Sequence, residues 1–312
     1  MLVTGGAGFL GAAFAQRARA LGHHVVTLDR ARAADLRVNV EDVEAVALAV
    51  RVARPEVIVH LAAMLTTDAA ADALAATCVN ALGTAAVYAA AARAQVPRVI
   101  DAGSIAAIGA TTHDVGDDAT LAPLTVYGAT KAYGEHLARA LSVLPGQPEF
   151  VVLRFGWIYG PGRVRGWRVV QEVVEQFARG EAVVRYPDFA EPIDFTYVDD
   201  AVEVLLRACA QRLPAFSALN VLGDRRTMRE LVHHLTQRFP RARAEAIPAA
   251  SPPAGWRARN DGLGAALGYV PDTRLEEGVD ALLDALASGA SAGSTSPTHA
   301  PKPTLARPGA SQ

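Results

Sequence analysis

Three glycines that follow the first apolar run constrain the fold of this chain more than any other feature. In LVTGGAGFLGAAF, Gly5, Gly8 and Gly11 stand between a short β-branched run and a helix-like segment over 9–21. A strand that turns tightly into a helix leaves backbone N–H groups free to bind a pyrophosphate, and side chains at these positions would obstruct the turn, the ligand or the helix–strand contact. The spacing predicts a dinucleotide-binding unit, with a purely structural turn as the alternative.

Short β-branched runs alternate with helix-like segments over the first two thirds of the chain. The runs are MLVTG, HVVTLD, VIVHLAA, RVIDAGS and FVVLRFG, and the helix-like segments cover 9–21, 41–53, 70–95 and 127–144. Nearly continuous apolar strands between helices are typical of a parallel sheet that is buried on both faces. The pattern predicts an α/β fold with a Rossmann-like, doubly wound parallel sheet.

An aspartate ends the second predicted strand. Asp29 closes HVVTLD, and a carboxylate there accepts hydrogen bonds from the adenosine-ribose hydroxyls and repels a 2′-phosphate. This position favours NAD over NADP. Arg30 could instead pair with a phosphate, although a solvated arginine is the simpler interpretation. Asn39 stands where a third strand would end, so its amide is either an adenine contact or a turn residue.

Composition narrows the class of protein. The 312 residues are 51% apolar with a net charge of −2, which allows a sizeable core and argues against an electrostatic nucleic-acid binder. Cys78 and Cys209 lie in apolar surroundings, which favours reduced core thiols over a disulfide or metal site. We find no signal peptide and no 18-residue apolar run, and therefore expect a cytoplasmic protein with no membrane span.

A tyrosine and a lysine begin the segment over 127–144. In TVYGATKAYGE, Tyr127 and Lys131 are four residues apart and share one helix face. Free tyrosine titrates near about 10, and adjacent positive charge favours the phenolate. Ser104 follows the fourth predicted strand, where its hydroxyl could hold a substrate oxygen. The three residues predict a base for hydride transfer from a secondary alcohol, with an accidental surface pair as the alternative.

The motifs resemble one known family when they are taken together. TGGAGFLG, VIVHLAA, VNALGT, GSIAAIG, YGATK, LRFGWIYGPG and DFTYVDDA occur in order over roughly residues 1–285. The combination resembles the extended short-chain dehydrogenase/reductase superfamily and, more narrowly, the NAD-dependent epimerase/dehydratase family. The resemblance implies an NAD-dependent enzyme that acts on a small molecule. Family members often form homodimers through two helices of each subunit, here 70–95 and 127–144.

The resemblance also assigns roles to individual residues. The expected catalytic residues are Ser104, Tyr127 and Lys131. The residues expected to bind NAD are Gly5, Gly8, Phe9, Leu10, Gly11, Asp29, Arg30, Asn39, Val40, Leu61, Ala62, Ala63, Asn80, Tyr127 and Lys131. The residues expected to contact the substrate are Met64, Ser104, Trp157 and Arg163, and no metal ligand is expected. His60 is expected to be hydrogen-bonded to backbone rather than catalytic, and Tyr159 and Trp256 to be structural.

The domain organisation follows from the change of pattern after about residue 160. We expect an NAD-binding Rossmann domain over 1–160, to which parts of 190–225 return, and a mainly substrate-binding lobe over 161–287. The segment 288–312 is nearly all Ser, Ala, Gly, Pro and Thr, and we expect it to be disordered because it offers too few apolar side chains to bury.

Two positions depart from the pattern of nucleotide-sugar enzymes. Trp157 stands where these members usually carry an asparagine, and Ile193 where they usually carry an arginine, and both family residues serve the substrate's diphosphate. A charge-assisted contact of this kind is worth about 1.5–3 kcal/mol. The arginines that could compensate are Arg154, Arg163, Arg165 and Arg168.

The sequence is therefore best interpreted as that of an NAD-dependent oxidoreductase or epimerase. This interpretation predicts reversible hydride transfer at a secondary alcohol or ketone of a small, sugar-like substrate without a nucleoside diphosphate, with Tyr127 as the base. The alternatives are a nucleotide-sugar epimerase or dehydratase, and a cofactor-sensing protein without turnover.

Overall fold

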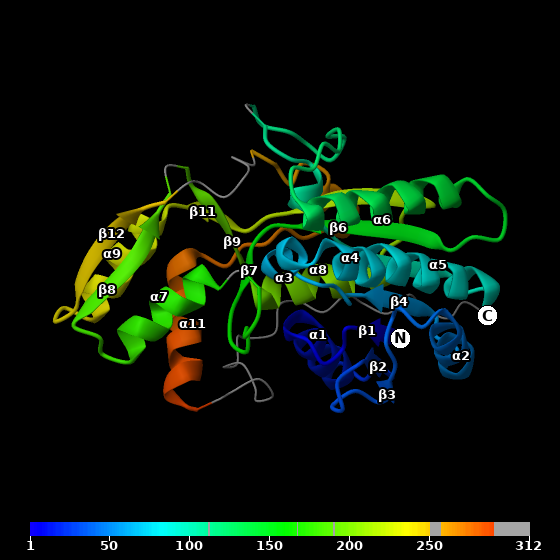
Figure 1. The fold of residues 1–312 in the computed structure, drawn as a ribbon, viewed down its shortest axis with the longest axis horizontal. Coiled ribbons are helices and arrows are strands. Elements are labelled where there is room, and N and C mark those ends of the chain that lie inside the picture. Colours follow the sequence, from blue (N-terminus) through cyan, green and yellow to red (C-terminus); the bar gives the residue numbers. More distant parts are fainter. Residues whose placement is uncertain (112, 167, 190, 250–256, 290–312) are drawn as a thin grey trace.

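A parallel sheet of seven strands forms the core of the larger of two lobes (Figure 1). The computed structural model describes residues 1–111, 113–166, 168–189, 191–249 and 257–289. The strands in spatial order are β10 (Phe216–Val221), β6 (Glu149–Phe155), β5 (Arg98–Ser104), β4 (Val57–His60), β1 (Leu2–Thr4), β2 (Val26–Asp29) and β3 (Leu36–Arg37). The order reverses between β1 and β4, and ligands of such sheets bind beyond the carboxyl ends of the strands at that point. The predicted Rossmann-like sheet is confirmed.

Helices cover both faces of this sheet. The helices on one face are α1 (Phe9–Ala20) and α8 (Val198–Ala210), and those on the other are α2 (Val43–Ala53), α5 (Gly83–Arg93) and α6 (Val126–Ser142). Successive strand residues point to opposite faces. Leu2 therefore packs with Val46 of α2 and Val87 of α5, whereas Val3 packs with Phe14 of α1 and Leu205 of α8.

The helix predicted over 70–95 is divided into several elements. It consists of the end of α3 (Thr66–Ala71), then α4 (Ala73–Ala76), a π-helical turn (Thr77–Leu82) and α5. Asp72 interrupts α3 and caps α4 by accepting a hydrogen bond from the Ala75 N–H. Single π-helical turns often occur at functional sites, and this one carries Asn80.

One segment passes the length and composition test for a membrane span, contrary to our expectation. It is Ala73–Arg93, and 44% of its apolar window is buried. Its buried residues pack against α2, α6 and the sheet. Because a core helix passes the same test, this segment is weak evidence for a membrane span.

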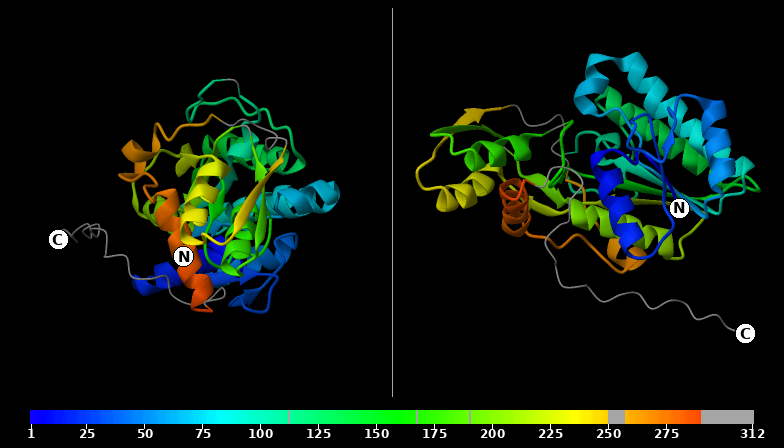
Figure 2. Two further views of the ribbon diagram at one scale, coloured as in Figure 1. Left: turned by 90° about the vertical axis from the view of Figure 1, so that its left-hand side faces the viewer. Right: turned by 90° about the horizontal axis from the view of Figure 1, so that it is seen from below.

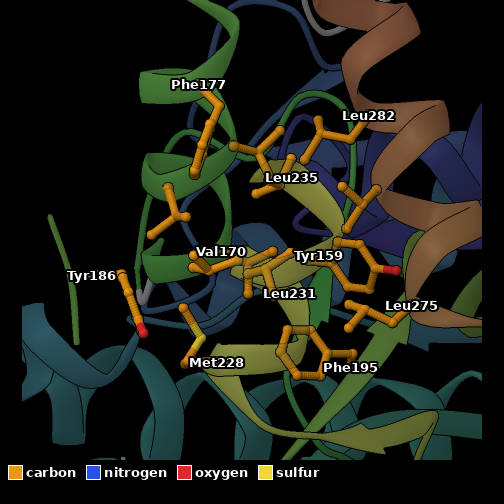
Figure 3. Packing of buried hydrophobic residues seen from close by; sticks show 14 of the residues in the cluster. Tyr159, Val170, Phe177, Tyr186, Phe195, Met228, Leu231, Leu235, Leu275 and Leu282 are labelled. Carbon is orange, nitrogen blue, oxygen red and sulfur yellow. The ribbon is translucent and has the colours of Figure 1, made fainter. Parts of the chain in front are cut away.

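The smaller lobe lies at one end of the molecule in Figure 1 and in the right-hand view of Figure 2. Its strands are β7 (Ile158–Tyr159), β9 (Ile193–Tyr197) and β11 (Asp224–Arg226) in one sheet, and β8 (Val183–Asp188) and β12 (Arg243–Pro248) in another. Its helices are α7 (Val169–Ala178), α9 (Met228–Arg238) and α11 (Leu275–Ala287). Phe177, Leu231 and Leu275 from these helices belong to one buried cluster with Tyr159, and Figure 3 shows Leu275 next to the Tyr159 ring.

Strand β10 returns to the large sheet beside β6 after the chain has entered the smaller lobe. The short helix α10 (Leu263–Leu267) then packs against α8 and β10. The sequence patterns did not indicate α10, β11 or β12. Trp256 and the tail from residue 290 onward lie outside the described residues, so their predictions stay predictions.

Candidate active site

The glycine turn lies against the segment that follows β4. Gly5 has a φ of +67°, and a Cβ there would be 2.7 Å from the Ala62 backbone nitrogen. A Cβ on Gly11 would be 2.2 Å from the Gly5 carbonyl oxygen, so both positions require glycine. Gly8 is less constrained, because its nearest contact would be 3.1 Å away. The turn ends at the N-terminus of α1, where backbone N–H groups favour an anion.

Asp29 holds the glycine turn from the end of β2. Its Oδ2 accepts a hydrogen bond from the Ala7 N–H (3.2 Å) and its Oδ1 accepts one from the Ala31 N–H (3.0 Å). Arg30 is exposed at the next position. Asn39 is also exposed, and its amide donates to Glu41 at 2.6 Å. The structure therefore shows Asn39 in a turn contact, and its contact with adenine stays a prediction.

The remaining residues predicted to bind NAD come from several segments near β1, α1 and α5. The Leu61 and Ala62 N–H groups both donate to Thr4, which fixes the segment 61–64 beside β1. Phe9 and Leu10 lie in the first turn of α1 and pack against the core of the smaller lobe. Val40 is buried against Gly83 at the start of α5.

Ser104 and Tyr127 are brought together by two turns at the carboxyl end of β5. Ser104 ends β5, and its Oγ accepts a hydrogen bond from the Ala106 N–H (3.2 Å) in a short 3-10 turn (Ile105–Ala107). Thr125 caps α6 by accepting a hydrogen bond from the Gly128 N–H. A Cβ on Gly128 would be 2.3 Å from the Ala106 carbonyl oxygen, so the first turn of α6 packs directly on this 3-10 turn.

Lys131 lies one helical turn after Tyr127 on the same face of α6. Its Nζ is 5.9 Å from the centroid of the Tyr127 ring and donates to the Ala102 carbonyl oxygen at 2.7 Å. This hydrogen bond anchors the ammonium to β5, two residues before Ser104. The ammonium therefore lies beside the Tyr127 ring at the carboxyl end of β5.

Arg163 is a second cation near Tyr127. Its guanidinium lies 5.4 Å from the centroid of the Phe9 ring and interacts electrostatically with Tyr127. Burial lowers the pKa of Arg163. The residue predicted to contact the substrate therefore lies against Phe9, in the first turn of α1, and within electrostatic range of the phenol.

Asp194 fixes the backbone at Trp157. Its carboxylate accepts hydrogen bonds from the Trp157 N–H (3.1 Å) and the Thr196 hydroxyl (3.0 Å), and burial raises its pKa to about 7. Trp157 is partly buried against the core of the smaller lobe. Ile193 is only 4% exposed and belongs to that core. Packing accounts for its apolar side chain, so the sequence argument that Ile193 lines the substrate site loses its support.

Two predictions about buried polar residues need correction. Arg154 does not point toward a substrate, because Glu135 binds its guanidinium at 2.6 and 2.7 Å inside the protein. The sequence feature that could have indicated this ion pair is Glu135, because it stands four residues after Lys131 on the same helix face. His60 is fully buried, and its partners are the side chains of Thr4 and Thr84 rather than backbone. Burial lowers the pKa of His60 to about 4, so the imidazole is neutral.

The two cysteines and the acidic side chains show no metal site or disulfide in the part of the chain that the structure describes. Within the described ranges, no group of three or more His, Cys, Asp or Glu side chains is placed to hold a metal ion. Cys78 and Cys209 are free thiols, and burial raises the pKa of Cys209 to about 12.

Comparisons with known proteins place the chain among epimerases and dehydratases. The sequence model of the NAD dependent epimerase/dehydratase family matches residues 1–221. The UDP-glucose 4-epimerase of Mycolicibacterium smegmatis is 30% identical over 229 residues, which cover 66% of this chain and 72% of that protein. Two other curated epimerases are 34% and 30% identical but are matched over only 28% of their own length.

Two solved structures have nearly the same extent as this chain. MoeE5 in complex with UDP-glucuronic acid and NAD is 26% identical, with a TM-score of 0.82 over 92% of this chain and 99% of that one. The UDP-glucose 4-epimerase of Thermus thermophilus, in complex with NAD, is 27% identical, with a TM-score of 0.79 over 91% of this chain and 97% of that one.

Proposed function

Because the chain belongs to the NAD dependent epimerase/dehydratase family, we propose that it oxidises a ring carbon of a nucleotide sugar and then returns the hydride. The observation that carries this proposal is that the first turn of α6, which carries Tyr127, packs on the 3-10 turn that follows Ser104, while Lys131 is hydrogen-bonded to Ala102 of β5. The relatives named above act on or bind UDP-sugars, which supports a nucleotide sugar as the substrate class. A protein that only senses the cofactor would not need these three residues.

The glycine turn fits a bound dinucleotide. Gly5 and Gly11 leave no room for side chains, and the N-terminus of α1 supplies backbone N–H groups for a pyrophosphate. Asp29 would accept hydrogen bonds from the adenosine ribose, and Lys131 could hold the nicotinamide ribose. When bound, NAD supplies the hydride acceptor.

Tyr127 acts as the base in this proposal. Its phenolate removes the hydroxyl proton while the C–H hydrogen leaves as hydride, which gives a ketone. Ser104 holds the substrate oxygen during this step, and Tyr127 returns the proton when the ketone is reduced.

The proposed substrate, a nucleotide sugar, differs from the small, nucleotide-free substrate that the sequence favoured. Of the two departures that supported the small substrate, Ile193 is explained by packing and only Trp157 remains. Arg163 is a half-buried cation near Tyr127 and could bind a diphosphate. These observations favour the nucleotide sugar.

Calorimetry on the NAD-loaded enzyme tests this choice. We expect UDP-glucose or UDP-glucuronic acid to bind and free glucose to bind far more weakly. Arg163→Ala should weaken nucleotide-sugar binding at least about tenfold, because a charge-assisted hydrogen bond is worth about 1.5–3 kcal/mol. Arg165→Ala is the control, since Arg165 is exposed on the same loop. Binding of free sugars or polyols without any binding of nucleotide sugars would revive the small substrate.

Asp29 should set the preference for NAD over NADP. We expect the wild type to bind NAD at least about tenfold more tightly than NADP, which corresponds to about 1.4 kcal/mol. Asp29→Asn keeps an acceptor for the Ala7 N–H but removes the charge, so it should lower the ratio of NAD affinity to NADP affinity. Fluorescence titration with each cofactor measures the two affinities. Equal affinities in the wild type would point to Arg30 as a phosphate ligand.

We also propose a homodimer that forms through the α4–α6 face, defined by Leu74, Leu82 and Tyr133. These three side chains are exposed, and α4 and the π-helical turn contact α6. Light scattering should give twice the subunit mass for the wild type and the subunit mass for Leu82→Asp. Val52→Asp, on the exposed side of α2, should remain dimeric. A monomeric wild type would exclude this interface.

A further inference from the structure

We propose that His60 is a positioning residue for Tyr127, and that it acts through a buried hydrogen-bond network between the glycine-turn strand and the catalytic helix. The network consists of Thr4, His60, Thr84, Asn80 and Thr130. None of these side chains is more than 7% exposed. The inference rests on the proposed role of Tyr127 as the base.

The first half of the network joins β1 to the π-helical turn through His60. The Thr4 Oγ1 lies 2.6 Å from the His60 Nδ1, and the His60 Nε2 lies 3.0 Å from the Thr84 Oγ1. The Thr84 hydroxyl donates to the Asn80 carbonyl oxygen at 2.5 Å. Thr4 immediately precedes Gly5, so this half begins at the glycine turn.

The second half joins the π-helical turn to α6. The Asn80 Nδ2 donates to the Thr130 Oγ1 at 3.0 Å, and the Thr130 hydroxyl donates to the Tyr127 carbonyl oxygen at 2.8 Å. Asn80 also holds Met64, accepting from its N–H (2.7 Å) and donating to its carbonyl (3.0 Å). The Met64 N–H can only donate, so the orientation of the Asn80 amide is fixed.

The partners of His60 determine its tautomer. Thr84 has one hydroxyl proton and gives it to Asn80, so the His60 nitrogen that faces Thr84 must be the donor. The neutral imidazole therefore carries its proton on Nε2, and Nδ1 accepts from Thr4. The hydrogen bond from Thr84 ends at the backbone carbonyl of Asn80, whereas the hydrogen bond to Thr130 starts from its side-chain amide. Because these two groups do not exchange a proton, the network can fix positions but cannot pass a proton from Thr4 to Tyr127.

This network lies between the two parts of the site that must keep a fixed separation. The glycine turn places the cofactor, and the first turn of α6 places the phenol. A displacement of about 1 Å between reacting groups can cost roughly 100-fold in rate. His60 connects β1 and β4 to Thr84 and through it to Asn80, and its loss should disturb this separation.

Variants of Thr130 test the network without removing bulk from the core. With UDP-glucose as the probe on the NAD-loaded enzyme, Thr130→Val should lower kcat at least roughly tenfold and leave KM within about threefold. Thr130→Ser keeps the hydroxyl and should stay within about threefold of wild type. A packing role predicts the reverse order, because valine preserves the volume. Equal rates for the two variants would overturn the proposal.

Substitutions of His60 and Thr84 should lower kcat through the same hydrogen-bond network as substitutions of Thr130. Thr84→Val and Thr130→Val together should be no slower than the worse single variant, because either change interrupts the same network. His60→Gln should reduce kcat in the same way. Tyr88→Phe is the control, since it removes a buried hydrogen bond from α5 to Asp101 outside the network. Effects that multiply in the double variant would count against a single unit.

Two measurements do not depend on turnover and therefore separate this proposal from the proposed function. Nitrogen NMR of labelled histidine should show His60 as the neutral Nε2–H tautomer near neutral pH. Hydrogen exchange of the segment 125–135 in the NAD-loaded enzyme should be faster in Thr130→Val and His60→Gln than in Thr130→Ser. An Nδ1–H tautomer, or unchanged exchange, would refute the network even if UDP-glucose proves not to be a substrate.

Discussion

Tyr127→Phe should reduce kcat by at least roughly a hundredfold and leave the Kd for NAD nearly unchanged. A positioned acid or base contributes about 10²–10⁴-fold to a rate, and this substitution removes only the ionisable hydroxyl. The ring would still lie beside Lys131. Single-turnover formation of NADH, together with product stereochemistry, measures the effect. Near-wild-type turnover in the pure variant would remove Tyr127 from the role of base.

Lys131→Met serves as the companion variant, because Lys131 has two proposed tasks. Its ammonium lies beside the phenol and could hold the nicotinamide ribose, so both kcat and NAD affinity should fall. Arg139→Met is a matched control, since it makes the same kind of change at an exposed position later on the same helix. A change in only one of the two quantities for Lys131→Met would assign the residue a single task.

The parts of the site that the sequence predicted are those that local geometry determines. Gly5 and Gly11 are required by a turn that is complete within a few residues, and the four-residue spacing of Tyr127 and Lys131 places them on one helix face. The strand runs likewise predicted a buried parallel sheet, because their pattern reflects burial on both faces. These inferences needed no knowledge of distant contacts.

The predictions that failed depended on which distant segment meets a side chain. Ile193 is in the core of the smaller lobe because β9 packs against helices that are far from it in sequence. The partners of His60, Thr4 and Thr84, come from two other elements. The π-helical turn has no periodicity signal that differs from that of an ordinary helix. None of these features could be read from spacing within one segment.

Arg154→Met should lower the free energy of unfolding by about 3–5 kcal/mol, the usual cost of breaking one side of a buried ion pair. The side chains of Arg154 and Glu135 are 1% and 3% exposed. Arg154 also donates to the Asp117 carbonyl and to the Asn220 side chain. Its removal therefore leaves a buried carboxylate and two further acceptors without their partner. Urea denaturation of the purified variants measures the change.

The double variant Glu135→Leu/Arg154→Met distinguishes charge burial from packing. It removes both charges, so it should be more stable than Arg154→Met alone, although the contacts to Asp117 and Asn220 remain lost. Arg229→Met, which breaks the exposed pair with Asp188, should have little effect. If Arg154→Met cost no more than Arg229→Met, the pair would not stabilise the fold. Because Glu135 shares the face of α6 that carries Tyr127 and Lys131, a stable double variant with lowered kcat would show that the buried pair also holds the catalytic helix against β6.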